Sequence, residues 1–239
     1  MVFGVEPIRE LIGAAPATVR ALYIKDGLEG RFAAEAAAIR QHGGRVTVAD
    51  DAELERLAGA AARHQGIVAS IREYRYAALE DVIARGADPI VIIDGVTDPR
   101  NLGAILRSAE CAGVRAIVIA KNRTAGITPA AIKASAGSWI HLTIGQCGNV
   151  VQALEALKKA GYWIAALAPG GDTSIYSLDT SRKLAIVLGS EDRGVRDLVR
   201  KHADFVVKIP MAGQVASLNV SVAAAVALFE VARRRTGQN

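Results

Sequence analysis

Residues 90–109 read IVIIDGVTDPRNLGAILRSA, and this stretch contains the two patterns that decide the fold. Its first four residues form a short, continuous apolar run, which is typical of a parallel strand buried on both faces. After a polar loop, apolar residues recur at helical spacing, at Leu102, Ile105, Leu106 and Ala109. The stretch therefore predicts a strand, a loop and a helix in succession.

The same alternation continues through the C-terminal two-thirds of the chain. Further short apolar runs occur at Ala116–Ala120, Trp163–Ala168, Leu184–Leu188 and Phe205–Ile209. Helical patterns separate them, and a long final helix is predicted from Ser217 to Arg235. This alternation predicts an α/β domain with a mostly parallel sheet and helices on both faces.

The first 75 residues also alternate between helix and strand patterns and have the size of a small α/β domain of their own. A polar segment rich in Arg, Glu and Tyr follows them. We therefore expect an N-terminal domain over residues 1–72, a linker over 73–88 and a larger domain over 89–239.

The composition is that of an ordinary globular protein. Of the 239 residues, 51% are hydrophobic and 22% are charged, which excludes wholesale disorder. No stretch approaches the ~18 apolar residues of a membrane span, and the N-terminus lacks the pattern of a signal peptide. The two cysteines, Cys111 and Cys147, are too few for a disulfide framework, so we expect a cytoplasmic protein.

The net charge of +5 is unevenly distributed along the chain. Residues 1–75 carry 10 basic and 10 acidic side chains, whereas residues 76–239 carry 19 basic and 14 acidic ones. An excess of basic residues in one part of a chain indicates a polyanionic partner for that part.

Several familiar catalytic patterns are absent from the sequence. The chain has no Gly-rich phosphate-binding fingerprint and no nucleophile elbow. Its four histidines lie far apart without metal-ligand spacing, so no metal site is expected. We interpret both cysteines as structural.

A first polar segment follows the apolar run 90–93 and leads through Asn101 and Gly103 to Arg107. Open parallel sheets bind ligands at the carboxyl ends of their strands, so this segment is a candidate binding loop. Asn101 is a favourable N-cap residue, and we expect it to begin the helix. Arg107 lies six residues further on and does not share a helix face with Asn101.

Two further segments follow apolar runs in the same way. After the run 184–188, Gly189 and Gly194 flank Glu191, and glycines allow the backbone to approach a ligand closely. After the run 205–209, a loop leads to Ser217, the expected N-cap of the final helix, with Asn219 in its first turn. Backbone N–H groups at such a helix start can bind a carboxylate or other polar groups.

Together the three segments resemble, in order and spacing, the signatures of the SpoU (TrmH-type) RNA ribose 2′-O-methyltransferases. These signatures are N-x-G-x-x-x-R over residues 101–107, G-x-E-x-x-G over 189–194, and I-P-M with S-L-N-V-S over 209–211 and 217–221. The N-terminal part adds Phe3-Gly4-Val5 and the stretch His64–Ala69. This pair resembles the branch of the family that methylates a guanosine ribose in 23S ribosomal RNA.

The resemblance implies a SPOUT-type fold whose C-terminal segment forms a deep trefoil knot, a feature that is nearly absent from proteins in general. It also implies S-adenosylmethionine as the methyl donor, a homodimer, and 23S rRNA as the substrate. For the N-terminal domain it implies a ribosomal-protein-like RNA-binding fold. Neither DNA nor a membrane is an expected partner.

The resemblance also assigns roles to individual residues. The positions of the methionine–adenosine pocket correspond to Gly189, Ile209, Met211, Ser217 and Leu218. The polar positions around the reaction centre correspond to Asn101, Arg107, Glu191, Ser217 and Asn219. In the family the arginine is often assigned as the base, but a guanidinium is effectively always protonated. Two interpretations of Arg107 therefore stay open, a base and a clamp for the adjacent phosphate.

Two positions depart from the family pattern. Asp192 replaces the first glycine of Glu-Gly-x-Gly, which is unfavourable if that position has a positive φ. Ile140 stands where the ribosomal branch often has glutamate, which keeps a tRNA-directed ribose methyltransferase as an alternative. A non-catalytic RNA-binding or assembly protein is the alternative from another class. A nucleotide-binding oxidoreductase is disfavoured by the missing Gly-rich fingerprint.

Overall fold

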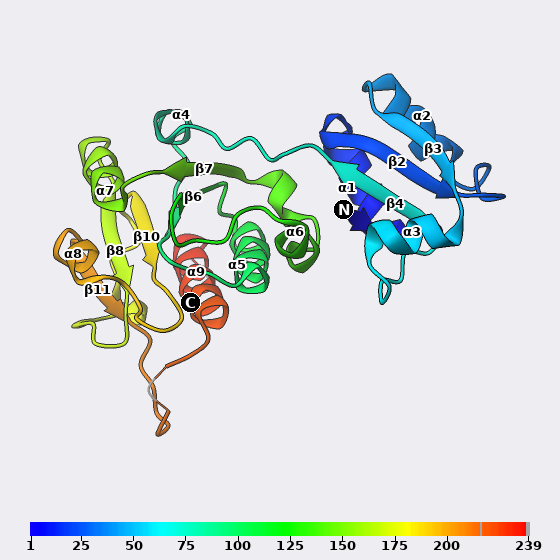
Figure 1. Ribbon diagram of the computed structural model, residues 1–239. Coiled ribbons are helices and arrows are strands. Elements are labelled where there is room, and N and C mark those ends of the chain that lie inside the picture. Colours follow the sequence, from blue (N-terminus) through cyan, green and yellow to red (C-terminus); the bar gives the residue numbers. More distant parts are fainter. Residues whose placement is uncertain (216, 238–239) are drawn as a thin grey trace. The chain divides into compact units, whose positions relative to one another are not determined.

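The computed structural model describes residues 1–215 and 217–237 (Figure 1). The chain forms two compact units, Met1–Arg75 and Tyr76–Asn239. Within the segment 73–88, where a linker is expected, Ala77 pairs with Gly145 of the second unit and helix α4 (Leu79–Ala84) buries Val82 there.

The N-terminal unit is a four-stranded sheet with helices. Its elements are β1 (Val2–Phe3), α1 (Val5–Ala14), the 3₁₀ helix η1 (Pro16–Thr18), β2 (Val19–Lys25), α2 (Ala33–Gln41), β3 (Arg45–Ala49), α3 (Asp51–Ala58) and β4 (Ile67–Ile71). The strand order is β1-β4-β2-β3, in which β2 and β3 are parallel and the other pairs antiparallel. The alternating pattern predicted for the first 75 residues is confirmed.

Two apolar layers stabilise this unit. Ile8 of α1, Leu22 of β2 and Ile39 of α2 are fully buried between the sheet and these two helices. Leu54 of α3 packs with Val68 of β4 in a second cluster. Successive residues of a strand point to opposite faces, so one sheet supports both layers.

The larger unit is built on a seven-stranded sheet. Its strands are β5 (Ile90–Ile93), β6 (Ala116–Ala120), β7 (Thr143–Cys147), β8 (Trp163–Leu167), β9 (Thr173–Ser174), β10 (Leu184–Leu188) and β11 (Phe205–Lys208). After α4, its helices are α5 (Pro99–Cys111), α6 (Pro129–Ser135), η2 (Ser138–His141), α7 (Val150–Lys159), η3 (Ile175–Ser177), α8 (Asp197–Lys201) and α9 (Val220–Arg235). The strand order is β7-β6-β5-β10-β8-β11-β9, and every pairing is parallel.

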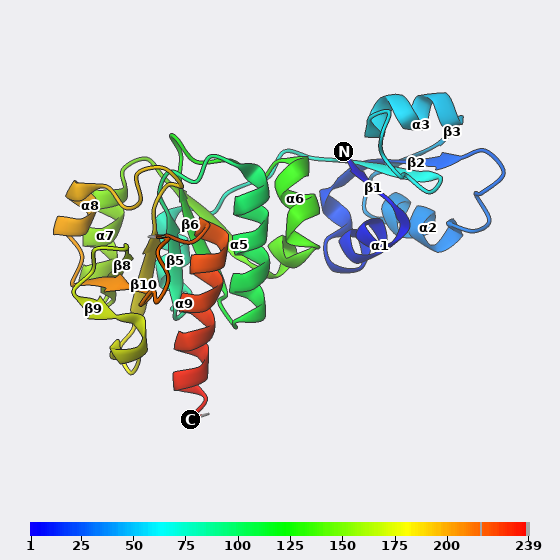
Figure 2. The same ribbon diagram turned by 90° about the horizontal axis from the view of Figure 1, so that it is seen from below.

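Helices cover both faces of this sheet, as predicted (Figure 2). Every residue of β5, β6 and β10 is buried, because their alternating side chains all meet a helix layer. On one face α4, α7 and α8 pack through Val82, Leu154 and Val199. On the other face α5 packs against α6 and α9.

Helix α5 begins earlier than the sequence predicts, and helix α9 begins later. Asp98, not Asn101, caps α5, and its Oδ1 accepts a hydrogen bond from Arg100 N at 2.8 Å. Pro99 then occupies the first helical position, where its missing N–H costs nothing. Asn219, not Ser217, caps α9, and its Oδ1 accepts from Ser221 N at 2.8 Å. A tertiary contact of Asn219, described below, decides between these two polar residues.

Strand β7 is absent from the sequence predictions because Gly145 and Gln146 interrupt its apolar run. Packing explains the glycine. A Cβ atom at Gly145 would lie 2.7 Å from Val82 Cγ2 and 3.3 Å from Ala77 O. The close approach of the segment before α4 therefore excludes a larger side chain from this edge strand.

Candidate active site

A cavity opens where the carboxyl ends of the parallel strands of the larger sheet meet. Its volume is about 290 Å³, and its wall comes from the segments that follow β8, β10 and β11 and from the start of α9. The position agrees with the rule that open α/β sheets bind ligands at this edge. All five residues expected for the methionine–adenosine pocket line this cavity, namely Gly189, Ile209, Met211, Ser217 and Leu218.

The loop after β10 is folded back on itself at the cavity wall. Ser190 N donates to Gly194 O and Gly194 N donates to Ser190 O, both at 3.0 Å. A Cβ atom at Gly189 would lie 2.1 Å from the carbonyl carbon of Gly194, so only glycine fits there. Asp192 lies between them without a positive φ, because the described non-glycine residues with positive φ are Gln65, Arg123 and Ala136. The strain considered for Asp192 is therefore not present.

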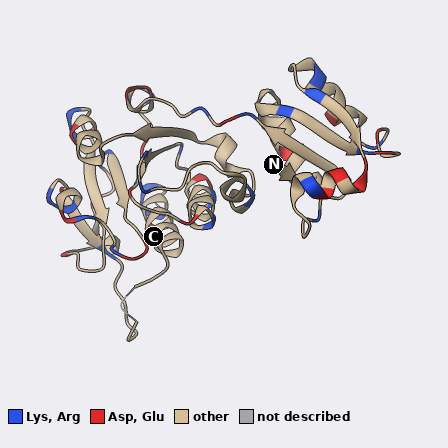
Figure 3. Cartoon of the chain, viewed as in Figure 1, with Lys and Arg blue, Asp and Glu red and all other residues tan. Residues whose placement is uncertain are grey.

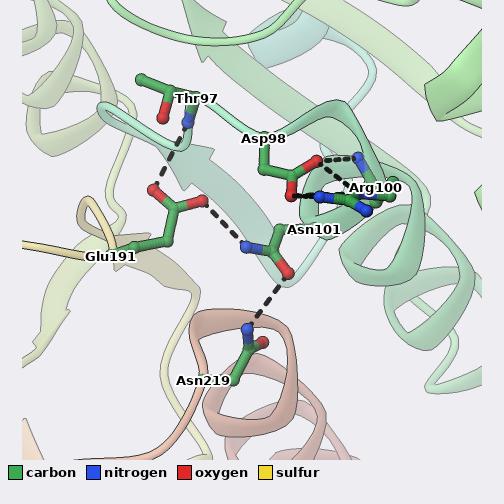
Figure 4. A network of polar contacts seen from close by, with 6 residues as sticks. All are labelled: Thr97, Asp98, Arg100, Asn101, Glu191 and Asn219. Atoms are coloured by element: carbon green, nitrogen blue, oxygen red, sulfur yellow. Dashed lines mark hydrogen bonds and ion pairs between the residues drawn. The ribbon is translucent and has the colours of Figure 1, made fainter.

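A chain of polar contacts joins all three predicted motifs next to this cavity (Figure 4). Glu191 Oε1 accepts a hydrogen bond from Asn101 Nδ2 at 2.9 Å, and Glu191 Oε2 accepts from Thr97 N at 3.4 Å. Asn101 Oδ1 accepts from Asn219 Nδ2 at 3.2 Å. Residues 90 to 118 positions apart in the sequence thus meet side chain to side chain.

The direction of these hydrogen bonds fixes the orientation of both amides. An ionised carboxylate accepts only, so Glu191 requires the N–H side of Asn101 to face it. Asn101 then presents its oxygen to Asn219, and Asn219 presents its own oxygen to the first turn of α9. Each amide nitrogen keeps a second N–H, and the carboxylate keeps further lone pairs. The arrangement therefore offers donors and acceptors to a ligand hydroxyl, which needs both.

Arg107 stands apart from this network. It is exposed on α5, and it makes no hydrogen bond or ion pair with the part of the chain that the structure describes. Arg100, by contrast, is held by the carboxylate of Asp98 at 2.9 Å, and this arginine lowers the pKa of Asp98 below its usual value. Arg107 is thus a cation available to a ligand, whereas Arg100 is paired.

A partly buried ion pair, which no sequence motif marks, joins the segments that follow β5 and β10. The Asp94 side chain is 4% exposed, and Arg196 binds both of its oxygens, at 2.8 and 2.9 Å. Asp94 follows β5, and Arg196 follows the loop after β10, so the pair fastens that loop to the sheet. Nearby, burial raises the pKa of the Cys147 thiol to about 11, with the Asp94 carboxylate as a further cause. Cys147 is therefore a protonated, structural thiol at neutral pH.

The segment at the end of β8 also contributes to the cavity, although it was not among the predicted site residues. Leu167, Ala168 and Pro169 line the cavity, as do Val220 and Ala223 of α9. The rule that ligands bind at the carboxyl ends of strands would have included Leu167–Pro169, because the apolar run before them was recognised. The residues of α9 carry no polar signal, so only the structure reveals them.

The described residues contain neither a metal site nor a membrane-spanning helix. Among these residues no group of three or more His, Cys, Asp or Glu side chains is arranged to hold a metal ion. No helix within the described ranges combines the length and apolar character needed to cross a membrane.

Known proteins share both units of this chain. The SpoU rRNA Methylase family matches residues 88–229, and the family described as RNA 2'-O ribose methyltransferase substrate binding matches residues 1–77. The chain therefore belongs to the SpoU rRNA methylase family, and the sequence-based resemblance is confirmed.

Individual relatives extend this result. The 23S rRNA (guanosine-2'-O-)-methyltransferase RlmB of Escherichia coli is 36% identical over 241 residues, which cover 99% of each protein. An uncharacterized tRNA/rRNA methyltransferase of Synechocystis sp. is 41% identical over 179 residues, 73% of this chain and 47% of that protein. The AdoMet-bound rRNA methyltransferase from Sinorhizobium meliloti superposes with a TM-score of 0.85 at 26% identity, over 98% of this chain and 86% of that one.

Proposed function

We propose that this protein transfers a methyl group from S-adenosylmethionine to the ribose 2′-hydroxyl of a guanosine in 23S rRNA. The observation that carries the proposal is the Asn101–Glu191–Asn219 network beside the cavity, because it unites the three family motifs in one site. The choice of 23S rRNA rests on the RlmB relative, whose similarity extends over both units. Such a substrate places the enzyme in the compartment where ribosomal RNA is processed, consistent with the expected cytoplasmic location.

The cavity has the chemical character that S-adenosylmethionine requires. Its wall combines apolar side chains, such as Ile209 and Leu218, with the polar backbone of the turn that begins at Gly189. Apolar walls with a few polar groups are typical of small-molecule sites. Gly189, Ile209, Met211, Ser217 and Leu218 would hold the donor, which supplies an electrophilic methyl group on a sulfonium centre.

The protein's own residues position the acceptor. In the transfer, the ribose 2′-oxygen would bond to the methyl carbon as the carbon–sulfur bond breaks. The donor would leave as S-adenosylhomocysteine, and the hydroxyl proton would pass to solvent water. Binding already aligns these atoms. The entropy lost in bringing them together is therefore not part of the activation free energy of the transfer. Asn101 and Asn219 donate N–H groups towards the ribose, while Glu191 keeps both amides in the required orientation. Ser217, on the cavity wall, contributes a hydroxyl near the reacting groups.

Arg107 acts as a clamp rather than a base in this proposal. A guanidinium remains protonated, so it stabilises negative charge on the adjacent phosphate and on the developing alkoxide. Its lack of a partner among the described residues leaves the full fork of donors available for this purpose.

Family membership also supports a trefoil knot and a homodimer. The strand order places β10 between β5 and β8, and α9 returns to pack against α5, as a chain that threads back through the sheet edge would require. For the dimer, Val222 and Phe229 of α9 are 48% and 49% exposed. These two side chains are seven residues apart and share one helix face, which suits a self-complementary apolar contact.

A transfer assay with labelled methyl donor tests the proposed function. The purified protein receives S-adenosylmethionine with a tritiated methyl group and either unmodified 23S rRNA or total tRNA. We expect label in 23S rRNA that is alkali-stable and is recovered as 2′-O-methylguanosine. Label in tRNA alone would contradict the substrate and keep the chemistry. No label in either RNA, with donor binding also absent, would contradict the whole proposal and favour a non-catalytic RNA-binding protein.

A further inference from the structure

The N-terminal unit is electrically polarised, although its 10 basic and 10 acidic residues cancel in the sequence. The backbone segments of its charged residues are unevenly distributed over the sheet (Figure 3). Basic segments occur where β2 and β3 begin, and acidic segments gather around α3. Strand pairing creates this separation, so composition alone cannot reveal it.

The basic end is assembled from four segments. Arg45 begins β3 and pairs with Ala21 of β2, next to Arg20. Strand β4 runs antiparallel to β2 and ends there, and Arg72 N donates to Thr18 O at 2.8 Å. After α2, which contains Arg40, the turn brings Gly44 close to the same strand end. We name Arg20, Arg40, Arg45 and Arg72 the arginine end.

All four residues of the arginine end are exposed. None of them makes an ion pair or a side-chain hydrogen bond with any described residue. Three other cations of this unit are partnered by carboxylates, in Arg9–Glu35, Lys25–Asp51 and Arg56–Glu53. Among the remaining seven basic residues, which also include Arg31, Arg63 and Arg75, four gather at the arginine end.

The acidic end is too distant to neutralise these arginines. Asp26, Asp50, Asp51 and Glu53 follow the carboxyl ends of β2 and β3, where Asp26 N donates to Ala49 O at 3.1 Å. Four residue steps at roughly 3.3 Å each separate the two strand ends by about 13 Å. That distance exceeds the Debye length of about 8 Å at physiological ionic strength. Glu73 follows Arg72 in the sequence, so the arginine end combines four cations with this one adjacent carboxylate and keeps an excess of positive charge.

We propose that the arginine end of the N-terminal unit is the surface on which this protein holds the phosphate backbone of its RNA substrate, and that the acidic end faces away from the RNA. Guanidinium groups fit phosphate oxygens with two parallel hydrogen bonds, so four free arginines suit this partner. The inference rests on the proposed function, because it takes the RNA substrate from there. It assigns a surface to the RNA-binding role that the resemblance implies for the N-terminal domain.

Two full-length variants test this inference with an equal change in charge. The first replaces three residues of the arginine end, Arg20→Gln, Arg45→Gln and Arg72→Gln. The matched control replaces three cations elsewhere on the same unit, Lys25→Gln, Arg31→Gln and Arg56→Gln. Both lower the net charge by three, and thermal unfolding checks that each remains folded. Methyl transfer to 23S rRNA is measured as a function of RNA and salt concentration.

For the arginine-end variant we expect KM for RNA to rise by about tenfold or more while kcat at saturating RNA stays within twofold. Each lost phosphate contact lowers the slope of log affinity against log salt by roughly 0.7–0.9, so the slope should fall by about 2. The control should stay within twofold of wild type in both quantities. An unchanged KM and salt slope in the arginine-end variant, or an equal loss in the control, would overturn the inference. Absence of methyl transfer by the wild-type protein would instead refute the proposed function.

Discussion

The two edges of the larger sheet both use carboxylates, but in different ways. At the amino edge, Asp88 Oδ1 accepts from Leu184 N at 3.0 Å and from Arg235 at 2.8 Å, while Asp204 accepts from Ile164 N at 2.8 Å. These carboxylates hold the first residue of β10 and the second residue of β8. At the carboxyl edge, Glu191 instead receives the Asn101 side chain beside an open cavity. The carboxylates of the amino edge fasten strand starts. The carboxyl edge also has a fastening carboxylate in the Asp94–Arg196 pair, but in addition it presents the polar groups of this network to a ligand.

The hydrogen-bond partners of a charged side chain, more than its residue type, therefore indicate whether it stabilises the fold or is available to a ligand. Arg235 donates to Thr180 O at 3.0 Å and to Arg182 O at 2.9 Å besides its bond to Asp88, so three of its five N–H donors are occupied. Arg235 therefore ties the end of α9 to the segment before β10, in addition to its favourable interaction with the dipole of α9. Arg107 is exposed and without such partners among the described residues. Loss of Arg235 should therefore affect stability, and loss of Arg107 should affect turnover.

The largest expected effect concerns Arg107. In Arg107→Ala, the rate of methyl transfer at saturating RNA and donor should fall by about 10²–10³-fold, the range found when one donor to a developing oxyanion is removed. Donor affinity, measured by calorimetry with S-adenosylhomocysteine, should be unchanged. Arg115→Ala, the loss of an arginine paired with Glu110, is the control. Partial activity in Arg107→Lys would show that positive charge is what the clamp mainly supplies, and none at all would show that the clamp needs the paired donors of a guanidinium. Wild-type activity in Arg107→Ala would contradict the clamp.

The second effect concerns Glu191. In Glu191→Gln the amide oxygen can still accept from Asn101, but the bond loses its charge assistance and the amide NH2 faces the Thr97 N–H, donor to donor. Hydrogen bonds to charged groups contribute about 1.5–3 kcal/mol, so part of this contribution is lost. If this orientation matters mainly in the transition state, kcat should fall by roughly 10–100-fold. Thermal stability should change little because Glu191 is exposed. Single-turnover kinetics and a melting curve on the same sample check both statements. A large loss of stability with an unchanged rate would place Glu191 with the structural edge.

The third effect concerns the amino edge. In Arg235→Gln, bonds to two carbonyls and to Asp88 are lost, which should lower the free energy of unfolding by about 1–3 kcal/mol. The rate of methyl transfer below the melting temperature should stay within twofold of wild type. Urea unfolding and the transfer assay measure the two quantities. A rate loss comparable to that of Glu191→Gln would remove the distinction between the edges.

The smallest effect concerns the two cysteines. Cys147 ends β7 at the carboxyl edge, but it is buried with a pKa raised to about 11, so only about one molecule in a thousand carries the thiolate at pH 8. Cys111 is exposed at the end of α5. A disulfide reagent at pH 8 should therefore modify one thiol per folded chain and two after denaturation. Rapid modification of both thiols in the folded protein would contradict the packing around Cys147.

Much of the fold follows from local sequence patterns. The apolar runs at 90–93, 116–120 and 184–188 became central strands with those bounds, because continuous Val and Ile runs suit burial on both faces. Strand β7 escaped prediction because its Gly145 is selected by contact with Val82 and Ala77, which lie far away in the sequence. Long-range packing of this kind leaves no local signal.

The residues of the candidate site could also be predicted in part from local sequence patterns. Glu191, Asn101 and Asn219 follow strands or begin helices at the sheet edge that binds ligands, so position and motif agree. Their order of hydrogen bonding, the capping role of Asn219 and the Asp94–Arg196 pair depend on which side chains meet in space. The polarity of the N-terminal unit was hidden for the same reason, since its charges cancel along the chain.

The most direct test measures the rate at which 2′-O-methylguanosine forms in 23S rRNA under single-turnover conditions. Three proteins are compared, wild type, Asn101→Ala and Arg235→Gln, at a temperature where all three are folded. The account predicts equal rates, within twofold, for wild type and Arg235→Gln. For Asn101→Ala it predicts a rate at least about tenfold lower with donor affinity preserved, since one hydrogen bond to the reacting groups is worth roughly 1.4 kcal/mol or more. A wild-type rate in Asn101→Ala would contradict the claim that the carboxyl-edge network is the active centre.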